Sequence, residues 1–167
     1  MRLVTMFARE VARGSMALRT QITDAYKSAM KQKEARAVST LRLIQAALKD
    51  RDIAARGKGN PDGISDDEVL SLLQSMIKQR RDSIEAYEKG GRRELAQQEA
   101  EEIAVIEGFL PAQMSEDEIS DAVSTVIADV EAATLKDMGK VMGALKERFA
   151  GQMDFSKASA AVKSRLG

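Results

Sequence analysis

Hydrophobic residues recur along the first third of the chain at the spacing of amphipathic helices. Apolar residues three and four positions apart share one helix face, which can pack against a core. This spacing predicts helices over residues 18–32 and 35–56, with Leu18, Ile22, Ala25 and Ala29 inward in the first and Leu41, Ile44 and Leu48 inward in the second. Residues 57–63 (GKGNPDG) are rich in turn formers and predict a loop.

Two further helices are predicted before Pro111. Ser65 and Glu68 have the spacing of a capping box, in which each side chain bonds the other residue's backbone N–H. A helix with an apolar stripe follows to about residue 89, where Gly90-Gly91 predicts its end. The next helix covers about residues 92–109, and Pro111 closes it.

Residues 111–167 predict three short helices. Capping patterns at 115–118, at 134–137 and at Asp154 introduce helices that end near residues 131, 150 and 166. No stretch shows the sustained alternation of a strand. We therefore predict an all-α fold, with an N-terminal four-helix hairpin or bundle module (residues 16–110) followed by a small C-terminal three-helix module (residues 111–167).

One ion pair is predicted within the hairpin around Gly90-Gly91. Arg80 and Glu99 both lie within apolar stripes, at similar distances from the turn, so antiparallel packing should bring them level. The alternative is that both long side chains reach out to solvent.

The composition excludes several kinds of active site. The chain has no Cys and no His, which rules out thiolate nucleophiles, Cys-ligated metals and serine triads that use a His base. No Walker-type or G-x-G-x-x-G phosphate loop is present. Asp, Glu, Lys and Tyr still allow catalysis, but we identify no complete constellation and predict no catalytic residue, metal or cofactor. No apolar run approaches membrane-spanning length, so we predict a chain that is not integral to a membrane.

Residues 1–15 (MRLVTMFAREVARGS) differ from the rest, because they are Arg-rich and contain one acid. Three interpretations are open: an upstream start or tag-like leader before a start at Met16, a short organellar presequence, or a first helix. We favour the leader, because Arg13-Gly14-Ser15 resembles a cloning junction, and we expect it to be dispensable for folding. This interpretation predicts a cytoplasmic protein, and the presequence interpretation predicts a mitochondrial one.

Charge is distributed unevenly although the net charge is +0. Residues 17–59 and 133–167 are rich in Lys and Arg, whereas residues 112–132 contain acids and no bases. A solvated surface is the general explanation of such runs, and a surface for a polyanion is the specific one. Arg42, Lys49 and Arg56 recur every seven residues on the second helix and predict a strip that follows phosphates, although Asp50 and Asp52 adjoin it.

Two glycines also require an explanation, since an exposed glycine in a helix costs about 1 kcal/mol relative to alanine. Gly139 and Gly143 lie opposite the apolar face of the helix over residues 135–150, beside Lys136 and Lys140. Close packing of another helix is one explanation. The other is close approach of a ligand backbone, with the lysines placed for its charge. We hypothesise that these four residues line an RNA-contacting face.

Several stretches together resemble the GatB/YqeY family. The stretches are STLRLI (39–44), DRDIAARG (50–57), IKQRRDSI (77–84), EGFLP (107–111), DMGKVMG (137–143) and GQMD (151–154). The resemblance implies a helical bundle followed by a module similar to the tail of the B subunit of the tRNA-dependent glutamine amidotransferase. In that enzyme the tail helps to hold aminoacyl-tRNA, and the chemistry occurs elsewhere.

Three functions follow from these observations. The first is a tRNA-binding or accessory module without its own complete active site, with tRNA and amidotransferase or synthetase components as partners. The second, by family analogy, is a carbon–nitrogen ligase with glutamine as amide donor. The third is a protein–protein adaptor, which we rank close to the first.

Overall fold

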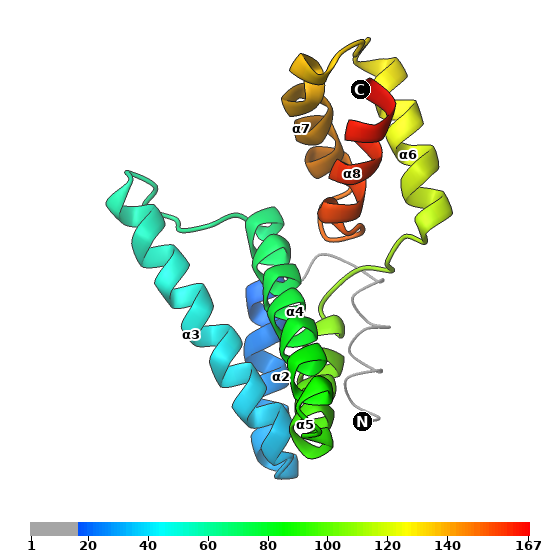
Figure 1. Cartoon of the computed structure of the whole chain (residues 1–167). Coiled ribbons are helices and arrows are strands. Elements are labelled where there is room, and N and C mark those ends of the chain that lie inside the picture. Colours follow the sequence, from blue (N-terminus) through cyan, green and yellow to red (C-terminus); the bar gives the residue numbers. More distant parts are fainter. Residues whose placement is uncertain (1–16) are drawn as a thin grey trace. The chain divides into compact units, whose positions relative to one another are not determined.

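Seven α-helices and one short 3-10 helix form the regular structure of residues 17–167, the residues that the computed structural model describes (Figure 1). The predicted all-α class is confirmed, and no strand occurs within this described range. No helix within it combines the length and the apolar character that crossing a bilayer requires. The interpretation of residues 1–15 as a dispensable leader lies outside the described residues.

The chain divides into two compact units, and the division falls between Leu110 and Pro111. The described part of the N-terminal unit consists of α2 (Leu18–Gln32), α3 (Ala35–Gly57), α4 (Asp66–Lys89) and α5 (Arg93–Glu107). Helices α2 and α3 form one pair, and α4 and α5 form a second, antiparallel pair around Gly90 and Gly91 (Figure 1).

The core of the N-terminal unit contains the apolar stripes that the sequence predicts. Ile22, Ile44, Leu73 and Ile106 come from the four helices and are almost completely buried. The predicted capping box is present at the start of α4: the Ser65 hydroxyl accepts from the Glu68 N–H, and the Glu68 carboxylate accepts from the Ser65 N–H. Capping satisfies backbone N–H groups that the first turn leaves without intrahelical partners.

The predicted Arg80–Glu99 ion pair is wrong in its partner. Arg80 is buried and donates from Nε to Glu102, at 2.8 Å. Arg80 lies ten residues before Gly90, whereas Glu99 lies eight and Glu102 eleven residues after Gly91. Both helices rise by the same distance per residue, so residues at nearly equal distances from the turn lie opposite each other. Glu102 matches the distance of Arg80 from the turn more closely than Glu99 does.

The C-terminal unit consists of α6 (Glu116–Asp129), the 3-10 helix η1 (Leu135–Asp137), α7 (Met138–Arg148) and α8 (Phe155–Leu166). Its separate core includes Val123, Val141, Leu145 and Val162, which are almost completely buried. The helix predicted over residues 135–150 is thus divided into a 3-10 turn and a shorter α-helix. The Asp137 carboxylate accepts from the backbone N–H groups of Ala133 and Thr134 at this point, which fixes the turn before α7.

Candidate functional site

The first candidate surface lies on η1 and α7. Lys136, Gly139, Lys140 and Gly143 are all exposed. A Cβ atom built on either glycine would meet no described atom within 4 Å. Burial of both glycines against another helix of this chain was the competing explanation, and the described residues do not support it. The two glycines therefore leave a flat stretch of helix backbone that a ligand can approach closely.

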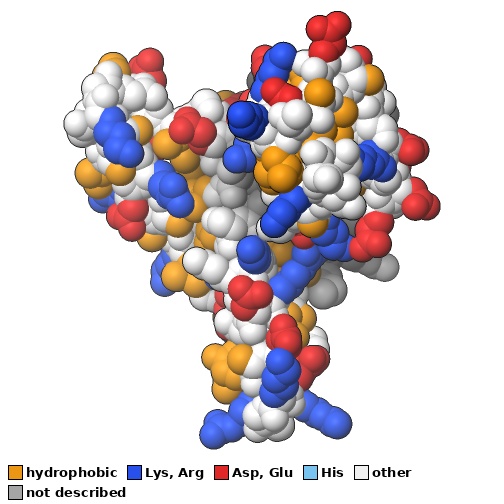
Figure 2. Space-filling view, turned by 45° about the horizontal axis from the view of Figure 1, so that its top comes forward, with side chains coloured by type: hydrophobic (Ala, Val, Ile, Leu, Met, Phe, Trp, Pro, Cys, Tyr) orange, Lys and Arg blue, Asp and Glu red, His pale blue; other side chains and the backbone are white. Residues whose placement is uncertain are grey.

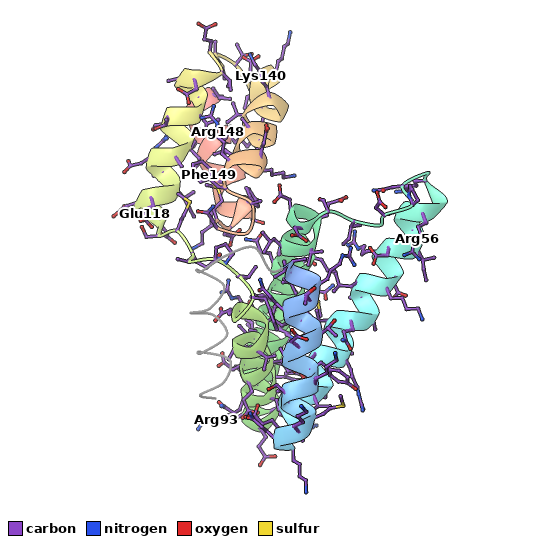
Figure 3. All side chains as sticks on the ribbon, turned by 180° about the vertical axis from the view of Figure 1, so that it is seen from behind. Arg56, Arg93, Glu118, Lys140, Arg148 and Phe149 are labelled. Atoms are coloured by element: carbon purple, nitrogen blue, oxygen red, sulfur yellow. The ribbon has the colours of Figure 1, made fainter. Side chains whose placement is uncertain are left out.

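The lysines beside these glycines have different surroundings. The Lys140 Nζ donates to the backbone carbonyl of Val130, at 2.7 Å, which ties the start of α7 to the C-terminal end of α6 (Figure 3). A cation at a helix C-terminus satisfies a free carbonyl and interacts favourably with the helix dipole. Asp137 lies nearby, and the backbone N–H groups of Ala133 and Thr134 hold the pKa of its carboxyl below the usual value. Asp137 is therefore ionised at neutral pH and offsets part of the lysine charge.

The second candidate surface follows α3. Arg42, Lys49 and Arg56 are exposed, and Arg56 lies near the far end of the helix (Figure 3). The Arg42 guanidinium lies over the Tyr26 ring, 5.9 Å from its centroid, and donates to the Tyr26 hydroxyl at 2.9 Å. These two contacts hold the Arg42 guanidinium beside Tyr26, although the cation–π distance is near its outer limit of about 6 Å. Lys49 and Arg56 border a pocket of about 410 Å³ between α2 and α3.

Two features of this surface were missed by the sequence reasoning. The first is the pairing of Arg19 with Asp52, through two hydrogen bonds of 2.6 and 2.8 Å. Arg19 also donates to the carbonyl of Ile64, and the Ile64 N–H donates to Asp52, so the pair fastens the loop after α3. The hydrogen bond from Arg19 is the main cause that lowers the pKa of Asp52. Asp52, one of the two acids that adjoin the basic strip, is therefore paired with Arg19, whereas the other acid, Asp50, is exposed.

The second missed feature is apolar surface beside the strip. Leu43 and Ile53 are 50% and 55% exposed, and Ala46 and Ala54 are exposed as well. The sequence already shows these apolar residues close to Arg42 and Lys49 along the same helix. The sequence analysis identified the basic residues on the outer side of this helix but not the apolar residues beside them.

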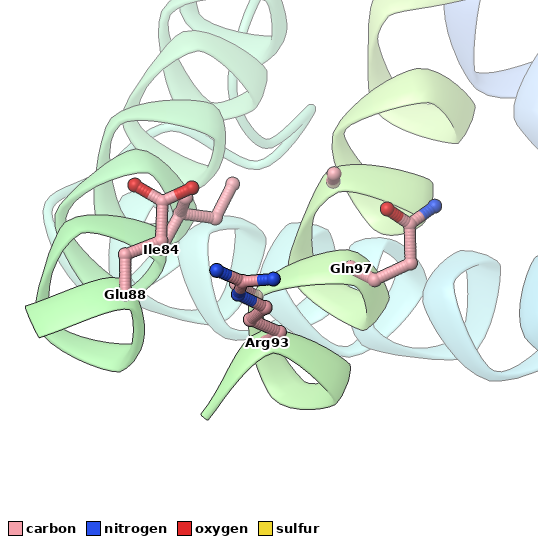
Figure 4. Close-up of a pocket in the computed structure, with 6 residues that line it drawn as sticks. Ile84, Glu88, Arg93 and Gln97 are labelled. Carbon is pink, nitrogen blue, oxygen red and sulfur yellow. The ribbon is translucent and has the colours of Figure 1, made fainter. Parts of the chain in front are cut away.

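A further pocket, of about 480 Å³, lies between α4 and α5 near their connecting turn (Figure 4). Arg93 lies between Glu88 and Gln97 in this view, and Ile84, Ala96 and Ala100 complete the lining. These groups include no nucleophile paired with a base, so they offer no catalytic constellation. Within residues 17–167, no three acidic side chains are grouped closely enough to hold a metal ion.

The sequence of this chain matches a known protein family. The sequence profile described as "Yqey-like protein" matches residues 19–166, nearly all of the chain. The chain belongs to the YqeY-like family. The match covers both units, so the candidate surfaces on α3 and α7 are parts of one YqeY-like chain.

Three curated relatives are named "Altered inheritance of mitochondria protein 41, mitochondrial". The protein from Pyrenophora tritici-repentis is 30% identical over 73% of this chain and 67% of its own length. The protein from Lachancea thermotolerans is 32% identical over 63% of this chain and 55% of its own length. That from Kluyveromyces lactis is 27% identical over 63% of this chain and 56% of its own length. This YqeY-like chain therefore spans between about half and two thirds of the length of the relatives it matches.

Proposed function

We propose that this YqeY-like chain is a tRNA-binding accessory protein that assists amidotransferase or synthetase enzymes and has no complete active site of its own. The observation that carries the proposal is the exposed face of α7. There Gly139 and Gly143 leave helix backbone uncovered, and Lys136 and Lys140 lie at its side. The resemblance of the C-terminal unit to a tRNA-holding tail supports tRNA as the ligand.

A sugar–phosphate backbone can lie close to a helix surface that has no side chains, and neighbouring lysines then neutralise phosphates. Such contacts position a nucleic acid without reading its sequence, and their strength falls as salt rises. The basic strip on α3 is not needed for this proposal.

We expect Gly139→Leu and Gly143→Leu to weaken tRNA binding by about tenfold each, a loss of about 1.4 kcal/mol. Leucine would fill the space through which the ligand approaches. The same changes should raise helix stability, because leucine favours a helix interior more than glycine does. Electrophoretic mobility shift with bulk tRNA across a salt series measures the binding, and circular dichroism measures the stability.

Gly139→Ala and Gly143→Ala are the matched controls, because a Cβ fits at both positions without contact. They should stabilise the helix and retain most of the binding. If the leucine variants bind tRNA as the parent does, the α7 face is not the RNA surface. If no binding of tRNA is measurable at low salt, the proposed function itself is wrong.

The names of the relatives also bear on location. Each contains the word mitochondrial, which supports the mitochondrial alternative over the cytoplasmic one. If residues 1–15 act as a presequence, isolated mitochondria should import the full chain and should not import a variant that starts at Met16. Equal import of the two, or import of neither, would contradict this.

A further inference from the structure

Helix α3 is apolar on two opposite faces. Leu41, Ile44 and Leu48 point into the core and are at most 6% exposed. Leu43 and Ile53 lie on the opposite side, together with Ala46 and Ala54, and we call these four residues the outer stripe. A helix that is hydrophobic on both sides is typical of one that is covered on both sides. Within the described residues, only the inner side is covered.

Basic side chains follow one edge of the outer stripe. Arg42, Lys49 and Arg56 are spaced by seven residues, so they form a straight row along it. The acids of α3 are Asp50, which is exposed and lies on the same face as Ala46 and Ala54, and Asp52, which is paired with Arg19. In Figure 2, Lys and Arg side chains lie next to hydrophobic ones on the left arm, which contains the end of α3.

A groove borders the same edge. The charged residues that line the pocket between α2 and α3 are three bases and one acid, Arg19, Lys49, Arg56 and Asp52. Its apolar lining residues are Ile22, Leu48 and Ile53. Its volume is about 410 Å³. The groove and the outer stripe together present apolar surface beside a row of bases.

We propose that the outer stripe of α3 and the adjoining groove bind an amphipathic helix of a partner protein, with an apolar seam flanked by Asp and Glu. Helices that dock on other helices bury an apolar seam and place charges at the flanking positions, seven residues apart. A row of bases with this repeat is complementary to acidic flanks. The proposal does not rest on the tRNA-binding role.

The charges argue against a second copy of this chain as the occupant. Two α3 helices packed stripe to stripe would bring rows of bases close together, which is unfavourable. The acidic helix α6 of a second copy does not fit either, because its apolar residues are already buried in the core of their own unit. These residues are Ile119, Val123 and Val126. Leu43 and Ile53 are aliphatic, so the outer stripe itself offers no flat side chain on which an RNA base can stack.

The test uses the full chain and two designed helical peptides of about three heptads. Both have Leu at the seam positions, and their flanks are either Glu or Lys. Fluorescence anisotropy at low salt should show at least roughly tenfold tighter binding of the Glu peptide. Reversal of the three bases (R42E, K49E and R56E together) should reverse this preference.

The apolar part is tested by Leu43→Ser combined with Ile53→Ser, which should weaken binding of the Glu peptide by about tenfold. Met30→Ser is the control, because Met30 is 43% exposed on α2 and lies outside the outer stripe. It should bind the peptide as the parent does.

Three outcomes would overturn the proposal. The first is equal binding of the two peptides by the parent. The second is unchanged binding by the double serine variant, and the third is a loss of tRNA affinity in that variant, which would identify an RNA surface. A failure here leaves the α7 test untouched, because the two sets of variants lie in separate units.

Discussion

Replacing Glu102 with alanine should destabilise the N-terminal unit by about 3–5 kcal/mol, because it leaves Arg80 buried without its anionic partner. Only 11% of the Arg80 side chain and 16% of the Glu102 side chain are exposed. Besides Glu102, Arg80 donates to the carbonyl of Met76. That neutral acceptor cannot compensate for a lost carboxylate.

A second cation increases the expected effect. The Arg36 Nη1 lies 3.8 Å from Glu102, and the Arg36 Nε donates to Glu101 at 3.2 Å. Glu102 therefore joins α3, α4 and α5 through two arginines. Its removal should loosen the contact between the two helix pairs as well as the hairpin.

Urea unfolding followed by tyrosine fluorescence measures this effect. The chain has two tyrosines and no tryptophan, and Tyr26 and Tyr87 both lie in the N-terminal unit. Arg81→Ala is the control, because Arg81 and Glu107 form an exposed pair at 3.6 Å and such pairs contribute about 0–1 kcal/mol. A combined Arg80→Met and Glu102→Leu variant should recover most of the stability, since no buried charge remains. If Glu102→Ala costs no more than Arg81→Ala, the buried pair is not structurally important.

The helix starts were the part of the fold that local sequence predicted best. Ser65, Ser115 and Asp154 accept from the first backbone N–H groups of α4, α6 and α8, as their spacing indicated. Capping depends on residues three positions apart, so a single chain contains the whole signal. The partner of Arg80 depended on register between two helices, and an error of three residues moved it by almost one turn.

The candidate site was less predictable, because its contacts join distant segments. Arg19 and Asp52 are 33 residues apart, and no local pattern links them. Lys140 reaches Val130 because α6 ends at Asp129, earlier than the sequence indicated, and leaves that carbonyl free. The exposure of Gly139 and Gly143 could be predicted from the sequence, because both lie opposite the apolar face of α7, which packs into the core.

Replacing Gly63 with alanine should destabilise the N-terminal unit by about 2–4 kcal/mol. Gly63 has φ +83, a conformation that L-residues rarely adopt. A Cβ there would also overlap the Asp52 carboxylate. The overlap would displace Asp52 from Arg19 and from the Ile64 N–H, which are charge-assisted hydrogen bonds.

Variants of two nearby glycines distinguish the effect of the positive φ from the effect of the overlap with Asp52. Gly59 has φ +92, but a Cβ there meets nothing within 4 Å, so Gly59→Ala should cost only about 1–2 kcal/mol of backbone strain. Gly57 is the last residue of α3, with no positive φ and open space around it. Gly57→Ala should therefore be neutral or stabilising, by up to about 1 kcal/mol. Tyrosine fluorescence during urea unfolding ranks the three variants.

The pH dependence of unfolding tests the role of Asp52 separately. The pKa of Asp52 is lowered in the folded chain, mainly by the hydrogen bond from Arg19. A carboxyl with a lowered folded pKa stabilises above its unfolded pKa, and this contribution is lost as pH falls through the folded value. Asp52→Asn should thus be less stable than the parent at neutral pH, and the difference should shrink on acidification.

Gly63→Ala should resemble Asp52→Asn in this respect, because both disturb the same carboxylate, whereas Gly59→Ala should keep the pH dependence of the parent. The comparison decides whether the loop is held by the ion pair or by backbone conformation alone. If Gly63→Ala and Gly59→Ala lose equal stability with equal pH dependence, the loop accommodates the added methyl group without moving Asp52. The Arg19–Asp52 pair would then not be what fastens the end of α3 to α2.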